Sequence, residues 1–153
     1  MYEIISSFPR DANRVPIDNL GIIVRKTIAY DGTSSKGLAG SNDIFTVTGD
    51  VAVKILAVCS DDLTVDGAAT IEIGITGNTA ALIAQTTASN IDKGEIWYDN
   101  TPVTVGSLAM GTWNFLSGTS IKEKITTANI TGGALTYYLF FVPLSADGNV
   151  LAV

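Results

Sequence analysis

The densest run of aromatic and β-preferring residues in the chain is Gly132-Gly133-Ala134-Leu135-Thr136-Tyr137-Tyr138-Leu139-Phe140-Phe141-Val142-Pro143-Leu144. It opens with a Gly-Gly turn signal and ends near a proline, which is typical of a strand. Its odd positions point to one face of that strand and its even positions to the other. Both sets are largely apolar, so neither face is suited to water. We therefore predict a central strand, covered on one side by a second sheet and on the other by loops or another subunit.

Length and composition limit the classes of protein that fit. At 153 residues the chain suits one domain that can bury a sizeable core without metal or disulfide. Hydrophobic residues make up 46% and charged residues 16%, and the 15 glycines favour many short strands over helices. A net charge of −6 argues against non-specific nucleic-acid binding, which depends on lysine and arginine. Such low charge with high apolar content indicates surface buried between subunits.

The chain lacks histidine and has one cysteine, Cys59, so it offers neither a Cys–His nor a Ser–His pair. We interpret Cys59 as a small buried hydrophobe, with a reactive thiol as the alternative. The first residues lack the basic and long apolar regions of a signal peptide. Since no apolar run approaches 18 residues, we expect no membrane-spanning helix.

Turn signals every 8–12 residues separate eight or nine predicted strands. Residues 1–19, which carry two of the four prolines, are expected to form an extended N-terminal arm. Residues 20–153 then form a single all-β domain, an antiparallel β-sandwich with jelly-roll-like character. We predict that residues 43–48 and 51–59 form a strand pair or one long strand bent at Gly49-Asp50. Residues 79–85 could form one or two helical turns, capped by Asn78 or Thr79.

Candidate acid or base residues are carboxylates alone. Glu72, Glu95 and Glu123 fall on separate predicted segments, so the sequence brings no two of them together. We place Glu72 and Glu123 in outward positions of alternating strands, where they would be solvated. The acidic run from Asp61 to Gly67 does not match the spacing of a calcium loop. We therefore expect no enzyme, no cofactor and no metal site.

Three aromatic residues could form a sugar-stacking platform: Trp97, Tyr98 and Trp113. Tryptophan covers the apolar face of a sugar ring well, but core packing is the commoner role of aromatics that flank strands. A carbohydrate-binding module is therefore the alternative function. Joint exposure of Trp97 and Trp113 would favour it.

Two long segments resemble small structural proteins of tailed-phage virions. The first is residues 69–97, in which an IEIGITGN strand leads into LIAQTTASNID and then an aromatic strand. The second is residues 130–144, which are similar to the closing strand of those proteins, and the opening RVPIDNLG of residues 14–21 also fits the group. The resemblance contains no catalytic motif, so it assigns no residue a role. It implies a virion component, namely a capsid decoration or cement protein, with a carbohydrate- or receptor-binding module of a phage tail or fibre as the alternative.

From this resemblance we expect a protein of the capsid surface, made in the host cytoplasm. Its partners would be the major capsid protein and further copies of itself, with a homotrimer favoured and a dimer as the alternative. We expect neither nucleic acid nor membrane as a partner. The residues expected at the oligomer or capsid interface are Tyr138, Phe140, Val142, Phe8, Val15 and Ile17.

Overall fold

A computed structural model describes residues 21–104 and 113–153 of the chain. Over these ranges the backbone forms strands and one single-turn 3-10 helix at Ala88–Asn90. The strands are β1 (Ile22–Ala29), β2 (Gly40–Thr48), β3 (Asp50–Val65), β4 (Thr70–Ile75), β5 (Asn78–Thr87), β6 (Ile96–Trp97), β7 (Asn114–Ser117), β8 (Ser120–Thr126), β9 (Ile130–Pro143) and β10 (Asn149–Ala152). The arm predicted for residues 1–19 lies outside the described residues.

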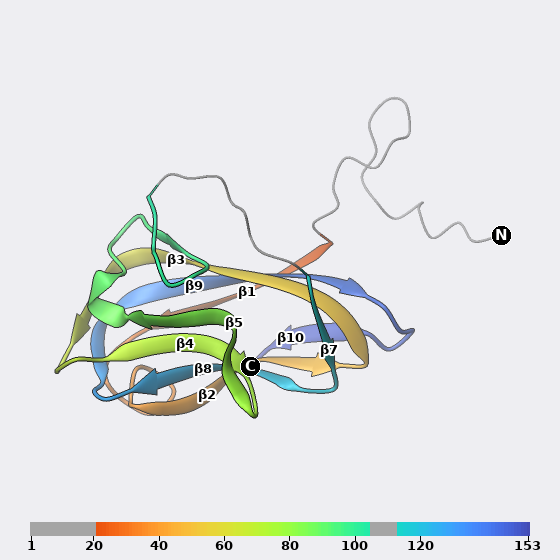
Figure 1. Cartoon of the computed structure of the whole chain (residues 1–153), viewed down its shortest axis with the longest axis horizontal. Coiled ribbons are helices and arrows are strands. Elements are labelled where there is room, and N and C mark those ends of the chain that lie inside the picture. The colour runs from red at the N-terminus through yellow and green to blue at the C-terminus, as the bar shows by residue number, and fades with distance from the viewer. Residues whose placement is uncertain (1–20, 105–112) are drawn as a thin grey trace.

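The strands form two antiparallel sheets that stack face to face (Figure 1). One sheet has the order β1-β9-β3-β6, with β7 also pairing with β3, and the other has the order β10-β2-β8-β4-β5. The prediction of an antiparallel β-sandwich is therefore confirmed. The prediction of a central strand at residues 134–143 is confirmed as well, because β9 lies between β1 and β3 along most of its length.

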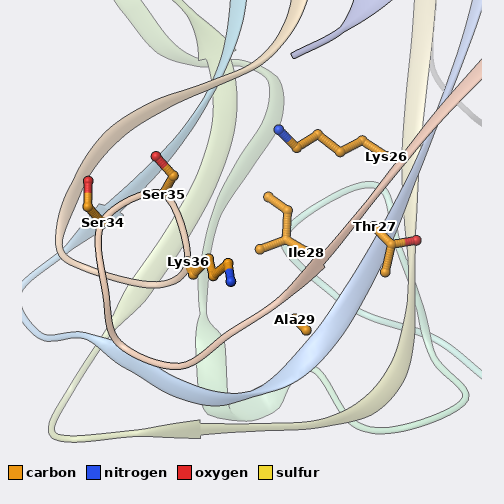
Figure 2. Close-up of a pocket in the computed structure, with 7 residues that line it drawn as sticks. All are labelled: Lys26, Thr27, Ile28, Ala29, Ser34, Ser35 and Lys36. Carbon is orange, nitrogen blue, oxygen red and sulfur yellow. The ribbon is translucent and has the colours of Figure 1, made fainter.

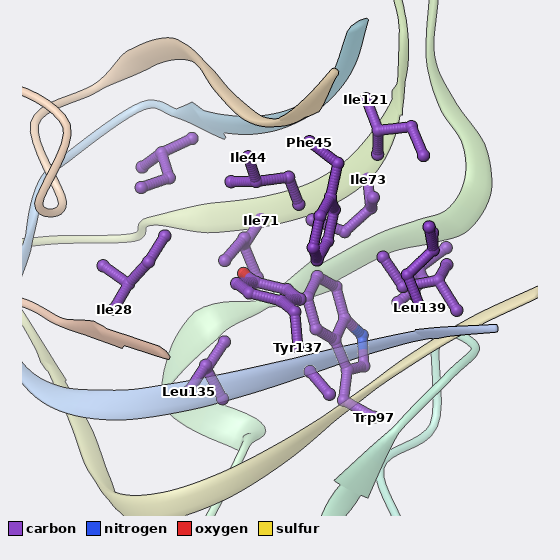
Figure 3. Close-up of a cluster of buried hydrophobic side chains, with 14 of the residues drawn as sticks. Ile28, Ile44, Phe45, Ile71, Ile73, Trp97, Ile121, Leu135, Tyr137 and Leu139 are labelled. Carbon is purple, nitrogen blue, oxygen red and sulfur yellow. The ribbon is translucent and has the colours of Figure 1, made fainter. Parts of the chain in front are cut away.

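The core lies between the sheets and follows from the alternation of side chains along each strand. Leu135, Tyr137, Leu139 and Phe141 of β9 all point inward and are buried. The facing sheet contributes a set of large apolar side chains, among them Phe45, Ile71, Ile73 and Ile121 (Figure 3). Burying each such side chain contributes about 1.5–3 kcal/mol to folding. The Cys59 side chain is also part of this core and is buried, as predicted.

The corner between β2 and β3 takes the chain from one sheet to the other. Gly49 stands there with φ +60°, a conformation that favours glycine. The two strands do not pair, because β2 pairs with β8 and β10 whereas β3 pairs with β9, β7 and β6. The predicted strand pair is therefore wrong, and the alternative of a continuous path bent at Gly49-Asp50 matches the structure.

The helical turns predicted for residues 79–85 are also wrong. These residues lie within β5, which pairs with β4 through two shifts of register. The shifts give β5 several more residues than the facing part of β4, so its start bulges over Gly74 and Glu72. Pairing with β4 decides the conformation of this alanine-containing stretch. Among the described residues no helix is long and apolar enough to cross a membrane.

Candidate functional site

The outer surface of the sheet that contains β9 carries several large apolar side chains. The β-pairing register arranges its outward side chains in rows that cross three or four strands. We call this surface the β9 face. The rows are Val142–Ala52–Phe115, Ile23–Phe140–Lys54, Arg25–Tyr138–Leu56 and Thr27–Thr136–Val58–Ile96.

Several large apolar side chains on the β9 face are open to solvent. Ile23 is 53% exposed and Phe115 is 64% exposed. Trp113, just before β7, is 37% exposed, and its ring centroid lies 5.1 Å from Lys54 Nζ. The rows include two cations, Arg25 and Lys54, and no carboxylate. The face is therefore apolar with a positive charge, although the whole chain carries −6.

The outer surface of the opposite sheet has a different character, and we call it the β8 face. Its rows bring together Asp43 with Lys122 and Glu72 with Lys124. Lys122 Nζ lies 2.6 Å from Asp43 Oδ1, and the hydroxyls of Thr70 and Thr126 lie 3.0 Å apart. The β8 face is therefore suited to water, whereas the β9 face is suited to a protein partner.

The predicted interface residues fall into two groups. Tyr138, Phe140 and Val142 all point outward from β9 and lie together on the β9 face. Side chains of the neighbouring strands cover part of each of them, so that Phe140 is buried and the other two are half-buried. Phe8, Val15 and Ile17 lie outside the described residues. The sequence did not reveal that Ile23, Phe115 and Trp113 complete the same surface, since that depends on which strands flank β9.

The predicted sugar platform of Trp97, Tyr98 and Trp113 is wrong. Trp97 points into the core and is 0% exposed, and its indole N–H donates to Thr86 Oγ1 at 2.8 Å (Figure 3). Trp113 is exposed on the β9 face, on the outer side of the sheet, and Tyr98 is half-buried. Because a buried ring cannot stack on a sugar, Trp97 and Trp113 do not act together.

A shallow cavity of about 400 Å³ opens beside β1 and the loop that follows it (Figure 2). Lys26 and Lys36 contribute to its wall, together with Ser34 and Ser35. Both ammonium groups already have partners, because Lys26 Nζ donates to the main-chain oxygen of Val153 and Lys36 lies 3.8 Å from Asp31. The cavity therefore presents no free cation to an anionic ligand.

The outward position predicted for Glu123 is wrong, and so is the solvent exposure predicted for Glu72. Glu123 shares the inward parity of Ile121 and Ile125, and its side chain is 0% exposed. Glu72 points to the β8 face but is covered by the start of β5, and Thr79 Oγ1 donates to its Oε1 at 2.5 Å. The position of Glu123 could have been read from the alternation of residues 121, 123 and 125.

Glu123 belongs to a buried polar cluster with two tyrosines. The hydroxyls of Tyr30 and Tyr137 each lie 2.5 Å from Glu123 Oε2. Burial raises the pKa of the Glu123 carboxyl, an effect that the two phenol hydrogen bonds and Lys26 partly oppose. Burial, and then the charge of Glu123, holds the pKa of both phenols well above the usual range.

The described residues contain no group of three or more histidine, cysteine or acidic residues that could hold a metal ion. The Glu123 cluster is closed to solvent, so no substrate reaches it in this conformation. Among the described residues we therefore take the β9 face as the candidate site.

Comparison with known proteins gives little further guidance. No protein-family model matches the sequence, and no curated protein matches it. One solved structure with a similar backbone is the acidic stable capsid structure of Helicobacter pylori bacteriophage KHP30, with a TM-score of 0.47 and 10% sequence identity. The match covers 87% of this chain and 94% of that chain. At this TM-score and identity the likeness carries no argument about function.

Proposed function

We propose that this protein is a structural component of a tailed-phage virion, a decoration or cement protein that stabilises the head by surface contacts. The observation that carries the proposal is the β9 face, a broad apolar surface on a sandwich whose other face is polar. A protein that works by contact needs such a surface, a stable core and no pocket. It would be made in the host cytoplasm and act on the outside of the capsid.

The sequence resemblance supports the same function. The resembling segments coincide with complete structural units, since residues 69–97 span β4, β5 and β6 and residues 130–144 contain nearly all of β9. The second of these segments supplies the middle strand of the β9 face. The resemblance therefore includes the part of the chain to which we assign the contacts.

We assign the β9 face to contact with a second copy of this chain, in a closed trimer that then binds the major capsid protein. Charge complementarity supports this choice. The face carries Arg25 and Lys54. Four carboxylates and one lysine gather where β3 meets the turn before β6, so that region is acidic on balance: Asp61, Asp62, Asp92, Glu95 and Lys93, whose Nζ lies 4.0 Å from Asp61 Oδ1. A head-to-tail contact would bring the cations of one copy to the carboxylates of the next, and such contacts close into a trimer when each copy is rotated by a third of a turn from the one before it.

The function is tested by quantitative mass spectrometry of purified virions whose genome encodes this chain. We expect the protein at a fixed ratio to the major capsid protein, and removal of the protein should lower the temperature at which the heads lose their DNA. Synthesis during infection without any protein on the particles would contradict the proposal.

Self-association is tested on the purified protein by light scattering at micromolar concentration. Ile23→Ser and Phe115→Ser should each shift the mass towards the monomer, because they remove exposed apolar area from the β9 face. Leu151→Ser is the matched control, since Leu151 is 61% exposed but lies on the β8 face. Equal effects of all three substitutions would contradict the assignment of the β9 face.

A further inference from the structure

Three buried oxygen atoms meet between the two sheets. They are Oε2 of Glu123 on β8, the hydroxyl of Tyr30 just after β1, and the hydroxyl of Tyr137 on β9. Each phenol oxygen lies 2.5 Å from the carboxyl oxygen, and the two phenol oxygens lie 3.1 Å apart. The two shorter separations are hydrogen bonds, and the third is long but within reach of one. The three atoms therefore form a closed ring of contacts.

A count of hydrogens favours one protonation state of this ring. Each phenol supplies one hydroxyl hydrogen, and an ionised carboxylate supplies none. With Glu123 ionised, two hydrogens serve three contacts, and the phenol oxygens face each other without a hydrogen between them. With Glu123 protonated, a third hydrogen is present. Each oxygen can then donate once and accept once around the ring.

The other carboxyl oxygen of Glu123 points to a second feature. Oε1 is buried and has no hydrogen-bond partner among the described residues. Asn42 stands directly opposite Glu123 in the β2–β8 register, and its Nδ2 is also buried and unpartnered. An acceptor and a donor on neighbouring strands suit one water molecule, which accepts from Asn42 and donates to Oε1.

We propose that Glu123 is a neutral carboxylic acid in the folded protein, hydrogen-bonded in a ring with Tyr30 and Tyr137 and to a buried water shared with Asn42, so that acid stabilises the fold. The surroundings offer one cation, Lys26, whose charge opposes the effect of burial on the carboxyl without outweighing it. Around the ring, β1 contributes Lys26, whose ammonium donates to Val153, and β3 contributes the Cys59 thiol. The facing residue of β4 is Ile73. An ionised carboxylate at this depth would lack a partner that compensates its desolvation.

The direction of the pH effect follows from linkage. Burial raises the folded-state pKa of Glu123 above its unfolded value of about 4.3. Its contribution to stability is fully present below the unfolded pKa and is lost as the pH rises through the folded pKa. An ionised carboxylate held by two phenols would have a lowered folded pKa and would lose its contribution as the pH falls. The neutral and the ionised state of Glu123 therefore predict opposite changes of stability with pH.

The test compares denaturant unfolding of the wild type and Glu123→Gln from about pH 3 to about pH 8. The unfolding constant of the wild type divided by that of the variant should rise with pH, by up to about tenfold per pH unit between the unfolded and folded pKa values. Asp99→Asn, at an exposed turn after β6 and outside the assigned contacts, is the control and should show no such rise. A flat or falling ratio for Glu123→Gln would overturn the proposal.

A second measurement uses the wild type alone, so the proposal remains testable even if the glutamine variant does not fold. Carbon-13 NMR of the folded protein, with Glu123 assigned, should show its carboxyl carbon titrating above the usual glutamate range. Titration at or below that range would overturn the proposal. A crystal structure should then show the water between Asn42 and Glu123, and continuous apolar packing at that position would refute this part of the proposal.

Discussion

Gly133 lies inside β9 in a conformation that no other residue type adopts easily. Its φ is +92°, and a Cβ atom at this position would lie 2.3 Å from the main-chain oxygen of Asp62 on β3. The Gly-Gly pair, which the sequence suggested as a turn, therefore lies within the strand. It lets the backbone of β9 approach that of β3 where their register shifts.

We expect Gly133→Ala to destabilise the fold strongly, and Gly77→Ala provides the comparison. Gly77 also has a positive φ, +89°, but an added Cβ there meets no atom within 4 Å. Gly77→Ala should cost about 1–2 kcal/mol from backbone strain alone. Gly133→Ala should cost clearly more, about 3 kcal/mol or above, because backbone must also move. Equal losses in urea unfolding would show that the contact with Asp62 is relieved without cost.

Residue roles were predictable from the sequence where strand alternation alone decides them, and not where a third element intervenes. The inward positions of Leu135, Tyr137 and Leu139 follow from parity, as does that of Glu123. Glu72 is different, because its burial depends on the bulge of β5. Trp97 is buried because β6 pairs at Ala57, a contact between residues 40 positions apart in the chain.

Among the elements, the turn between β8 and β9 is tied to two distant segments by Asn129. Its amide Nδ2 donates to Asp66 Oδ2 at 2.9 Å, just after β3, and its Oδ1 accepts from the Ala39 N–H at 2.9 Å, just before β2. The Asn129 side chain therefore links three segments of the chain: the turn between β8 and β9, the turn after β3 and the loop before β2.

We expect Asn129→Ala to lower the free energy of unfolding by about 1–3 kcal/mol, since it breaks both side-chain hydrogen bonds and leaves the Ala39 N–H without this acceptor. Asn100→Ala is the control, because the Asn100 side chain makes one long contact, 3.3 Å, with the next residue. Thermal unfolding of both variants measures the difference. An effect of Asn129→Ala no larger than that of Asn100→Ala would mean that water replaces these bonds.

Element types followed from local pattern, and pairing partners did not. The strand at residues 70–75 was predictable because isoleucines alternate with other residues. Residues 79–85 lack alternation and include three alanines, so the sequence alone left helix and strand close in energy, and pairing with β4 decided the outcome. The chain likewise passes from one sheet to the other at Gly49 because β2 pairs with β8 and β3 pairs with β9, and the local sequence does not specify these partners.

At the level of the whole molecule, the pairing of strands is nested along the chain. β1 pairs with β9, β2 with β8, β3 with β6 and β7, and β4 with β5. This order is what a long hairpin gives when it is wound into two sheets, with β10 added beside β2, and the jelly-roll character of the sandwich stays a prediction. The winding leaves β9 and β3 central in one sheet and so concentrates the apolar sequence on the β9 face.

The geometry of self-association can be determined from the sign of a charge effect. Arg25 is exposed on the β9 face, and Asp61 is exposed at the acidic end of β3. In a head-to-tail trimer these groups attract across the interface, so Arg25→Glu should weaken assembly. In a two-fold dimer that packs β9 face on β9 face, Arg25 meets further cations, so the same substitution should strengthen assembly.

We expect Arg25→Glu and Asp61→Lys each to raise the dissociation constant by about three- to tenfold at low salt, and the double variant to recover part of the loss, because the swapped charges again attract. The single-variant effects should shrink as ionic strength rises from about 0.01 M to about 1 M, since the screening length falls from about 30 Å to about 3 Å. Sedimentation velocity over a concentration series measures the constants. Tighter association of Arg25→Glu would exclude the head-to-tail arrangement, and a lack of recovery in the double variant would place the partner of Arg25 elsewhere on the neighbouring copy.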